Sequence, residues 1–498
     1  MYPEYYRDLL KNAELLRGKN INFSPAALNE QDKKILLYNH HPDYKNENFK
    51  VLQAGKNKGE KLPKELCGLL EKKSIEKAYE NDLSFVKYTV DVLVIGGGGA
   101  GTAAAIEAHK NKADVMIATK YRLGDSNTLM AQGGMQAVQS ENDSPFLHFT
   151  DTFGGGGFAA KKELVSKLVI EGISALSWLE DMGVLFDKTP EGEFITHKAG
   201  GTSRKRIHSA KDYTGKEIMR TLCDEVLNLG IKVLEYNAAQ ELIKDENGNI
   251  AGAVLLDTIT GQTAVVKAKA VVIATGGAGS LHIGGFETTN FKGSSADGLA
   301  LAYKAGCRLV DAESMQYHPT SAAFPEQISG MLVSEKARSL GAKLLNKSGN
   351  VFINPLETRD VVTAAIIREC EENGGIQTEN GKAVWLDTPM IDLISGKGTA
   401  EKQLPVCFKT FLNFGIDISK EPILVYPAFH YQNGGIEIDE NCFVSGFNNL
   451  FAAGEVTGGI HGKNRLMGNS LLDIIVFGRT AGENAAKTAK KSFVKATV

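Results

Sequence analysis

The sequence has no cysteine pair at the short spacing that iron–sulfur and zinc sites require. Its six cysteines are Cys67, Cys223, Cys307, Cys370, Cys407 and Cys442, each far from the next. Metal clusters in proteins are recognised by closely spaced ligands, whereas scattered cysteines are typical of small buried side chains in a reducing compartment. The pattern therefore predicts that the chain holds no metal and no iron–sulfur cluster of its own.

Long apolar runs and an excess of charge are missing as well. No run approaches the roughly 18–20 apolar residues that cross a bilayer, and the first residues lack the basic and apolar regions of a signal peptide. The formal net charge of the 498 residues is −3, which gives no electrostatic reason to expect nucleic acid or an anionic membrane as a partner. We expect a soluble, cytoplasmic protein with no direct membrane span and no nucleic-acid partner.

What is present is an ordinary globular composition, long enough for two or three domains. Residues 1–88 are rich in Lys, Glu, Asn and Leu and poor in glycine. Apolar residues recur at helical spacing in Tyr5–Leu16 and Glu65–Tyr79, and the polar stretch His40–Lys61 between them is typical of a loop. We therefore expect a mostly helical N-terminal extension over residues 1–88.

The character of the sequence changes at Asp91. Val92–Ile95 is a continuous apolar run, as in a buried parallel strand, and it leads through a glycine-rich turn into the alanine-rich stretch Thr102–Lys110. Two further apolar strands, Ala270–Thr275 and Leu450–Ala453, also end in glycine. Three strand–glycine turns so far apart indicate a discontinuous nucleotide-binding domain of the doubly wound α/β type, with a second domain inserted into it.

The first of these turns fits a dinucleotide-binding motif. Gly96, Gly98 and Gly101 have the required spacing, with a strand before and a helix after. These glycines permit a tight turn, a close approach to a pyrophosphate and close packing of the helix, whose N-terminus then faces the phosphates. The acidic residue that NAD sites carry about twenty residues further on is absent, and Thr119-Lys120 stands at the end of the second strand. These two features weaken the case for NAD as the cofactor.

Six sequence blocks resemble one enzyme family. Ser126–Gly134 is similar to the flavin-contacting segment of the succinate dehydrogenase/fumarate reductase flavoproteins, which also end their second strand in Ser/Thr-Lys. The other blocks follow in family order and are Met315–Thr320, Ser334–Arg338, Thr358–Asp360, His430–Gly435 and Gly454–Leu472. The resemblance covers about residues 89–490. It implies a Rossmann-like FAD-binding domain formed by residues 89–312 and 429–498, with an inserted α+β capping domain at 313–428.

The resemblance also implies the cofactor contacts. The positions that it assigns to FAD are Gly96, Gly98, Gly99, Ala100, Gly101, Thr119, Lys120, Ser126, Asn127, Thr128, Ala131, Gly133, Gly134, Ala239, Thr275, Gly276, Asp297, Glu455, Arg465, Ser470, Leu471 and Leu472. Members with covalent flavin attach it through a histidine at the position of Asn127. Because an amide cannot form that bond, we expect non-covalent FAD, which should favour reduction over succinate oxidation.

The activity implied by the resemblance is reduction of fumarate to succinate, or the reverse, with a C4-dicarboxylate as substrate. His318, Ser334 and Glu335 would line one end of the substrate site, and His430 and Arg465 would hold the other. Gly468 is assigned to the substrate as well.

The resemblance also assigns the catalytic steps. Arg359 would donate the proton, and Glu335 with Arg338 would return it. An arginine has a pKa above about 12 and can act as an acid only if it is rapidly reprotonated. Glu335 and Arg338 are three residues apart and can face each other on one helical turn. Because the chain has no cluster of its own, the resemblance implies that a partner iron–sulfur subunit supplies the electrons.

Three other functions stay open. L-aspartate oxidase is a homologue with non-covalent FAD, and the stretch Ala199–His208 resembles the oxidase more than the dehydrogenase. In the oxidases a glutamate before the Gly-Gly pair meets the substrate ammonium, but here that position is Ala199. The other two alternatives are a reductase of another acrylate-like acid and a non-catalytic electron-transfer flavoprotein. A non-catalytic electron-transfer flavoprotein would be expected to have lost the residues that bind substrate, and none of them is missing.

Overall fold

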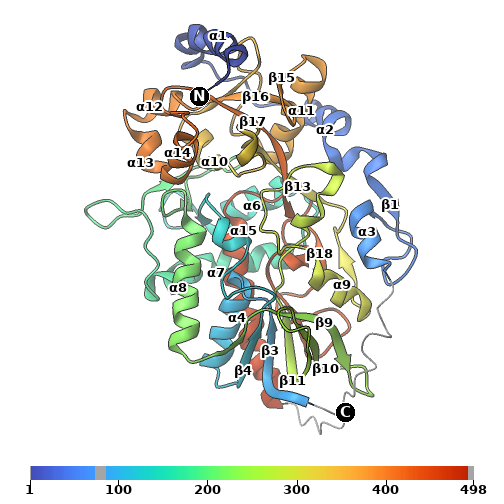
Figure 1. Cartoon of the computed structure of the whole chain (residues 1–498). Helices are drawn as coiled ribbons and strands as arrows, with labels where there is room; N and C mark the ends of the chain where they lie inside the picture. The colour runs from blue at the N-terminus through green and yellow to red at the C-terminus, as the bar shows by residue number, and fades with distance from the viewer. Residues whose placement is uncertain (1, 73–85, 492–498) are drawn as a thin grey trace.

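The computed structural model describes residues 2–72 and 86–491. Figure 1 shows the capping region above and the cofactor-binding sheet below, with the N-terminal segment running down one side. The chain has the mixed α/β architecture that the sequence predicted. Within the described residues, no helix combines the length and apolar character needed to span a bilayer.

The central sheet has seven strands in the order β8-β4-β3-β11-β10-β9, with β19 also paired to β11. The parallel strands are β3 (Val86–Ile95), β4 (Val115–Ala118), β8 (Lys232–Leu234), β11 (Thr263–Ile273) and β19 (Leu450–Ala452). Antiparallel β9 (Asn237–Lys244) and β10 (Ile250–Asp257) extend the sheet beside the first half of β11. β19 lies nearly 180 residues after β11, so strands far apart in the sequence share this sheet.

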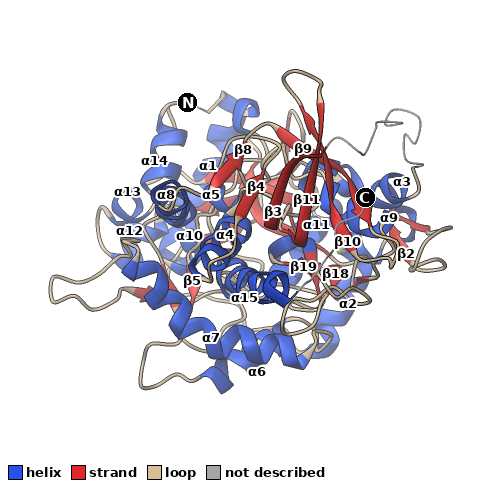
Figure 2. Ribbon diagram, turned by 90° about the horizontal axis from the view of Figure 1, so that it is seen from below, coloured by secondary structure: helices blue, strands red, loops and turns tan. Residues whose placement is uncertain are grey.

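Helices cover this sheet (Figure 2). They include α4 (Gly99–Lys110), α6 (Pro145–Gly155), α7 (Lys162–Asp181), α8 (Thr214–Asn228), α9 (Asp297–Lys304) and α15 (Asn469–Lys491). α4 and α15 pack unusually closely, since a methyl group at Gly482 would come within 2.0 Å of the Ala104 carbonyl oxygen. This contact holds the last helix against the first helix of the cofactor turn.

The capping region is built on an antiparallel sheet of β13 (Met315–Ala322), β17 (Ile423–Gln432), β16 (Gly381–Asp387), β14 (Lys343–Leu345) and β15 (Ile376–Thr378). Its helices are α10 (Glu335–Ser339), α11 (Arg359–Glu372), α12 (Met390–Ser395), α13 (Thr399–Gln403) and α14 (Pro405–Leu412). The expected boundary after residue 428 falls inside β17. β13 and β17 each contribute buried side chains to both hydrophobic cores, so this strand pair joins the two parts.

Small elements complete the fold. One three-stranded sheet consists of β5 (Met135–Gln136), β7 (Ile207–His208) and β6 (Thr196–His197). A second consists of β12 (Leu309–Val310), β18 (Gly435–Glu437) and β20 (Thr457–Gly458). The short helix α5 (Asn127–Met130) follows the second strand of the cofactor turn.

The N-terminal segment contains α1 (Glu4–Asn20), α2 (Glu30–His40) and α3 (Lys64–Leu70). The predicted helix over Tyr5–Leu16 is confirmed as part of α1. The prediction of a loop from residue 40 to 61 was incomplete, because β1 (Phe49–Val51) pairs with β2 (Lys61–Pro63). Of the helix predicted over 65–79, α3 covers the start, and residues 73–79 lie outside the described part of the chain.

Candidate active site and cofactor cavity

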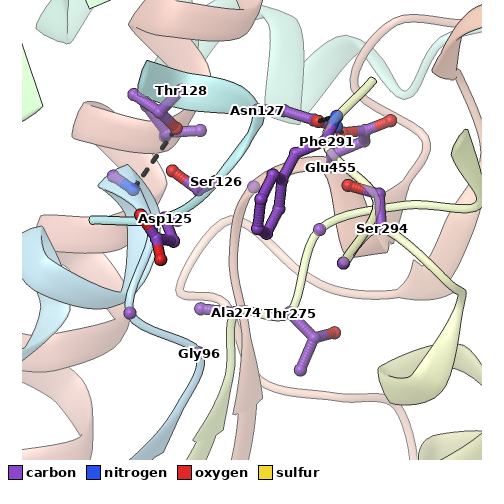
Figure 3. A pocket seen from close by; sticks show the side chains of 18 of the residues that line it. Gly96, Asp125, Ser126, Asn127, Thr128, Ala274, Thr275, Phe291, Ser294 and Glu455 are labelled. Carbon is purple, nitrogen blue, oxygen red and sulfur yellow. Dashed lines mark hydrogen bonds between the residues drawn. The ribbon is translucent and has the colours of Figure 1, made fainter. Parts of the chain in front are cut away.

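A large cavity lies at the carboxyl ends of β3, β11 and β19 (Figure 3). Its empty space, with the open solvent at the mouth included, is about 1290 Å³. All three strand–glycine turns predicted from the sequence line it, at Gly96, Gly276 and Gly454. The N-terminus of α4 faces it too, with Gly97–Ala100 in the lining. A helix N-terminus beside a glycine-rich turn suits a pyrophosphate.

Two glycines of the motif are required by the backbone. Gly96 has φ +118°, and a methyl group there would come within 2.2 Å of the Ala274 carbonyl oxygen. At Gly101 a methyl group would come within 1.9 Å of the Gly96 carbonyl oxygen. Gly101 therefore lets α4 pack against the turn and does not itself line the cavity.

Most of the predicted cofactor residues line this cavity. They are Gly96, Gly98, Gly99, Ala100, Thr119, Lys120, Ser126, Asn127, Thr128, Ala131, Ala239, Thr275, Gly276, Asp297, Glu455, Arg465, Ser470 and Leu471. Gly133 and Gly134 line a smaller neighbouring cavity instead. Leu472 points away and is fully buried in the core of the cofactor-binding domain.

The cavity has polar groups that suit a dinucleotide. Lys120 Nζ donates to Asp297 Oδ2 at 2.5 Å and to Ser295 Oγ at 2.6 Å, which fixes both side chains at the rim. Thr275 Oγ1 is buried in the lining and has no hydrogen-bond partner among the described residues. A buried hydroxyl of this kind is expected to bond a ligand or water. The residues present therefore fit FAD.

Asn127 is held by three neighbours inside the cavity (Figure 3). Its Nδ2 donates to Asn290 Oδ1 and, at 3.2 Å, to Glu455 Oε2, while its Oδ1 accepts from Phe291 N at 2.7 Å. Burial raises the pKa of Glu455, although backbone and side-chain donors oppose the shift. Sequence reasoning missed Asn290 and Phe291, since no motif marks that loop.

The smaller cavity adjoins the cofactor cavity. The two share Ala131, Leu332, His430, Arg465, Ser470 and Leu471 as lining residues. All seven residues predicted from the sequence for substrate binding or proton donation line the smaller cavity: His318, Ser334, Glu335, Arg359, His430, Arg465 and Gly468. The structure thus brings together residues that are up to 150 positions apart in the sequence.

The three residues predicted to form a proton relay lie beside one another. Arg359 Nε donates to Glu335 Oε2 at 2.8 Å, and Arg338 Nη2 lies 3.3 Å from the same oxygen. Glu335 Oε1 accepts from Gly200 N at 2.7 Å. All three side chains are buried. Burial would raise the pKa of Glu335, but the Arg359 and Arg338 guanidinium groups outweigh it and hold that pKa below its ordinary value.

Gln316 links the two arginines that line the smaller cavity and was missed as a site residue. Its Oε1 accepts from Arg359 Nη1 at 2.9 Å and from Arg465 Nη2 at 3.0 Å. Its Nε2 donates to the Arg465 carbonyl oxygen at 2.7 Å and to Asn464 Oδ1 at 3.0 Å. The amide therefore holds two guanidinium groups at one spacing. It lies within the Met315–Thr320 block, two residues before His318, so the signal was present.

The two histidines face each other across β13 and β17, with ring centroids 5.0 Å apart. His318 Nδ1 is within 2.9 Å of the Thr320 carbonyl oxygen, and His430 Nδ1 is within 2.6 Å of Thr289 Oγ1. Burial and nearby arginines lower both pKa values well below the ordinary value. Both rings are thus neutral, and each keeps Nε2 for other contacts.

Arg465 has an aromatic support. Its guanidinium lies 4.3 Å from the centre of the Tyr431 ring, and Nη1 donates to Ser470 Oγ at 3.0 Å. The Tyr431 hydroxyl is in turn 3.3 Å from Asp473 Oδ2 on α15. Burial and Arg359 lower the pKa of Arg465, while Tyr431 and Glu455 oppose the shift. The side chain is therefore a rigid cation between the two cavities.

Comparison with known proteins agrees with this geometry. The family described as FAD binding domain matches residues 91–471. A fumarate reductase (CoM/CoB) subunit of Methanothermobacter marburgensis is 40% identical over 415 residues, which is 81% of this chain and 74% of that protein. L-aspartate oxidase of Streptomyces coelicolor is 36% identical over 410 residues, covering 80% and 68%. A variant of Escherichia coli quinol fumarate reductase superimposes with a TM-score of 0.76 at 32% identity, covering 82% of this chain and 71% of that one.

The cavity and the length of the family match define an FAD-dependent oxidoreductase. The FAD cofactor expected from the sequence is thereby confirmed. The chain belongs to the flavoprotein family that includes the fumarate reductase flavoproteins and the L-aspartate oxidases.

Proposed function

We propose that this chain reduces the carbon–carbon double bond of fumarate to give succinate. The observation that carries the proposal is the buried chain Arg338–Glu335–Arg359 at a small cavity that adjoins the cofactor cavity. An acid supplied from behind by a relay is what protonation of a reduced double bond requires. Fumarate reductase flavoproteins are also among the relatives of this chain.

Groups that can bind anions line the smaller cavity, namely Arg465, His430, His318, Ser334 and Arg359. We assign Arg465 and His430 to one substrate carboxylate and His318 and Ser334 to the other. Planar guanidinium groups bind carboxylates in a fixed geometry, and Gln316 keeps the two arginines apart. This arrangement suits a short dicarboxylate with its carboxylates on opposite sides.

Each residue of the site has a separate role in the proposed reaction. Bound FAD would supply a hydride to one carbon of the double bond. Arg359 gives a proton to the other carbon, and Glu335 passes a replacement proton from Arg338. Arg465 and Arg359 stabilise the negative charge that develops on the substrate carboxylate. Arg359 is already aligned by Glu335 and Gln316, so little reorganisation is needed when the reaction occurs.

We infer that FAD is bound without a covalent link and that its electrons come from a partner iron–sulfur protein. The Asn127 amide has no nucleophilic ring nitrogen and is occupied by Asn290, Glu455 and Phe291. All six cysteines are unpaired and dispersed, which supports a reducing, cytoplasmic setting and an external electron source. Several relatives carry the word subunit in their names, in line with such a complex.

The test compares two reactions on one preparation of the FAD-loaded protein. We expect fumarate reduction with an artificial reductant and little or no oxidation of L-aspartate by oxygen. An ammonium would find no free carboxylate in the lining, because Glu335, the carboxylate that lines the smaller cavity, already bonds Arg359 and Gly200 N. A monocarboxylate would leave one end unpaired, at about 1–3 kcal/mol for each lost partner.

Three outcomes would contradict the proposal. Aspartate-dependent peroxide formation faster than fumarate reduction would make the protein an oxidase. Faster reduction of an acrylate-like monocarboxylate would change the substrate. No turnover of any of these would favour an electron-transfer role.

A further inference from the structure

The N-terminal segment contacts both parts of the molecule. Tyr2 and, within α1, Tyr6, Leu10 and Ala13 are buried in the core of the capping region. Leu52, Leu62, Leu66 and Cys67, from the hairpin and α3, are buried in the core of the cofactor-binding domain. In Figure 1 the segment runs from α1 at the top down to α3 beside the central sheet. It lies outside the part of the chain that matches the FAD binding domain family, which begins at residue 91.

α2 lies along the helix that begins with Arg359. Just before α11, Lys33 Nζ is 3.4 Å from Glu357 Oε2. At its end, His40 Nδ1 is 2.9 Å from Glu371 Oε2. Between these points Leu36 is buried against the core that contains the apolar face of α11. The whole length of α11 is thus supported by the N-terminal segment.

Glu357 is the point of contact nearest the catalytic residue. Its Oε1 accepts from Leu28 N at 2.8 Å, and the side chain is only 6% exposed. Both carboxylate oxygens are therefore held by the N-terminal segment, two residues before Arg359. Lys33 provides a positive charge and Leu28 N provides a hydrogen-bond donor to the same buried carboxylate of Glu357.

The same short turn is held from the opposite side. Gly201 N donates to the Leu356 carbonyl oxygen at 3.1 Å. A methyl group at Gly200 would come within 2.6 Å of the Glu357 carbonyl oxygen, so the two backbones are in close contact. Gly200 N in turn donates to Glu335, the partner of Arg359. The turn before α11 is therefore fixed between the N-terminal segment and the loop that bonds the relay carboxylate.

A second contact joins the N-terminal segment to β13, the strand that carries Gln316 and His318. Asp43 Oδ2 accepts from Met315 N at 3.0 Å, at the first residue of β13. Gln316 and His318 follow on that strand. The N-terminal segment therefore supports both elements that carry the residues around Arg359.

We propose that Glu357 is a positioning residue through which the N-terminal segment sets the place of Arg359 for proton transfer. The inference rests on the proposed function, because it assigns Arg359 the role of proton donor. Glu357 does not line the cavity and touches neither substrate nor cofactor in this arrangement. Its effect is exerted through the turn Leu356–Thr358 and the first residues of α11. A displacement of about 1 Å at a reacting group can cost on the order of 100-fold in rate.

The experiment compares three variants of the full-length, FAD-loaded enzyme. Glu357→Ala removes both contacts with the N-terminal segment, whereas Glu357→Gln keeps an oxygen that can accept from Leu28 N. Arg17→Met is the matched control. It breaks the ion pair of Arg17 with the fully buried Asp387 at the end of β16, in which the closest contact is 2.9 Å. That control leaves a buried carboxylate unpaired but does not touch the turn before α11.

We expect Glu357→Ala to lower kcat for fumarate roughly 10-fold or more with KM nearly unchanged. Glu357→Gln should recover most of the loss, and Arg17→Met should keep kcat while lowering the melting temperature. Amide hydrogen exchange should rise at residues 359–363 in Glu357→Ala and around residue 387 in the control. The proposal would be overturned if Glu357→Ala had the same kcat as the wild type. It would also be overturned if Arg17→Met lost as much kcat as Glu357→Ala, since the loss would then reflect lower stability alone.

The exchange measurement separates this inference from the proposed function. If the wild-type enzyme does not reduce fumarate, the proposed function fails, but exchange at residues 359–363 still tests the positioning. Unchanged exchange there in Glu357→Ala would sink the inference whatever the substrate is.

Discussion

Replacement of Arg359 by lysine separates geometry from charge at the active site. The guanidinium uses Nε for Glu335 at 2.8 Å and Nη1 for Gln316 at 2.9 Å, and the side chain also lines the smaller cavity. A lysine has one nitrogen on a flexible stem and cannot hold these two partners and a substrate carboxylate in one plane. The charge stays, so Glu335 is not left unpaired and Arg338 remains at 3.3 Å. Folding and FAD binding should therefore survive.

The size of the loss follows from the two contacts. A positioned acid contributes roughly 10²–10⁴ in rate, which is about 3–5 kcal/mol of activation free energy. The lost carboxylate contact adds to this. We therefore expect Arg359→Lys to lower kcat for fumarate by at least about 1000-fold, or on the order of 4 kcal/mol.

The assay is fumarate turnover with reduced viologen, normalised to the FAD bound per chain. Arg368→Lys is a matched control, because it makes the same change on the same helix and lies outside the lining of both cavities. It should keep near wild-type activity. If Arg359→Lys retains a tenth of wild-type turnover with full FAD content, the proton donor has been misassigned.

Two further predictions follow from the cofactor cavity and the relay. FAD should leave the polypeptide on acid or heat denaturation, because Asn127 offers only an amide; yellow fluorescence that stays with the protein band on a denaturing gel would contradict this. The value of kcat/KM for fumarate should not fall between about pH 8 and pH 5 through protonation of a site residue. Burial keeps His318 and His430 neutral because it lowers their pKa values well below 6.5, and Arg359 and Arg338, against the effect of burial, hold Glu335 ionised. A fall in activity centred near pH 6.5 in the pH–rate profile would show that one of the imidazoles titrates there.

The sequence predicted the parts of the site that depend on short motifs. Gly96 and Gly101 are forced by the backbone geometry of one turn, and that constraint is visible in their spacing. Arg359 and Glu335 belong to blocks whose residues act together, so each block supports the assignment of the others. This is why the smaller cavity contains the residues that were expected in it.

The parts that escaped prediction depend on contacts between distant segments. Asn290 meets Asn127 across 163 positions, and Leu28 meets Glu357 across 329, so no local pattern marks either pair. Gln316 looks like any polar strand residue until two guanidinium groups are seen to share its oxygen. Leu472 fits the motif but points into the core, because the helical turn after Leu471 carries it away from the cavity.

The order of the segments around the cofactor cavity bears on how the protein is made. The first glycine turn is translated early, but Gly454, Glu455, Ser470 and Leu471 belong to the last quarter of the chain. β19 and α15, which complete the sheet and cover α4, come from the same late part. The capping region, encoded between these parts, leaves the ribosome before the late part and can fold as a unit while the sheet is still incomplete. The cavity can be closed around FAD only after synthesis has passed Leu471, so loading with cofactor comes late in assembly.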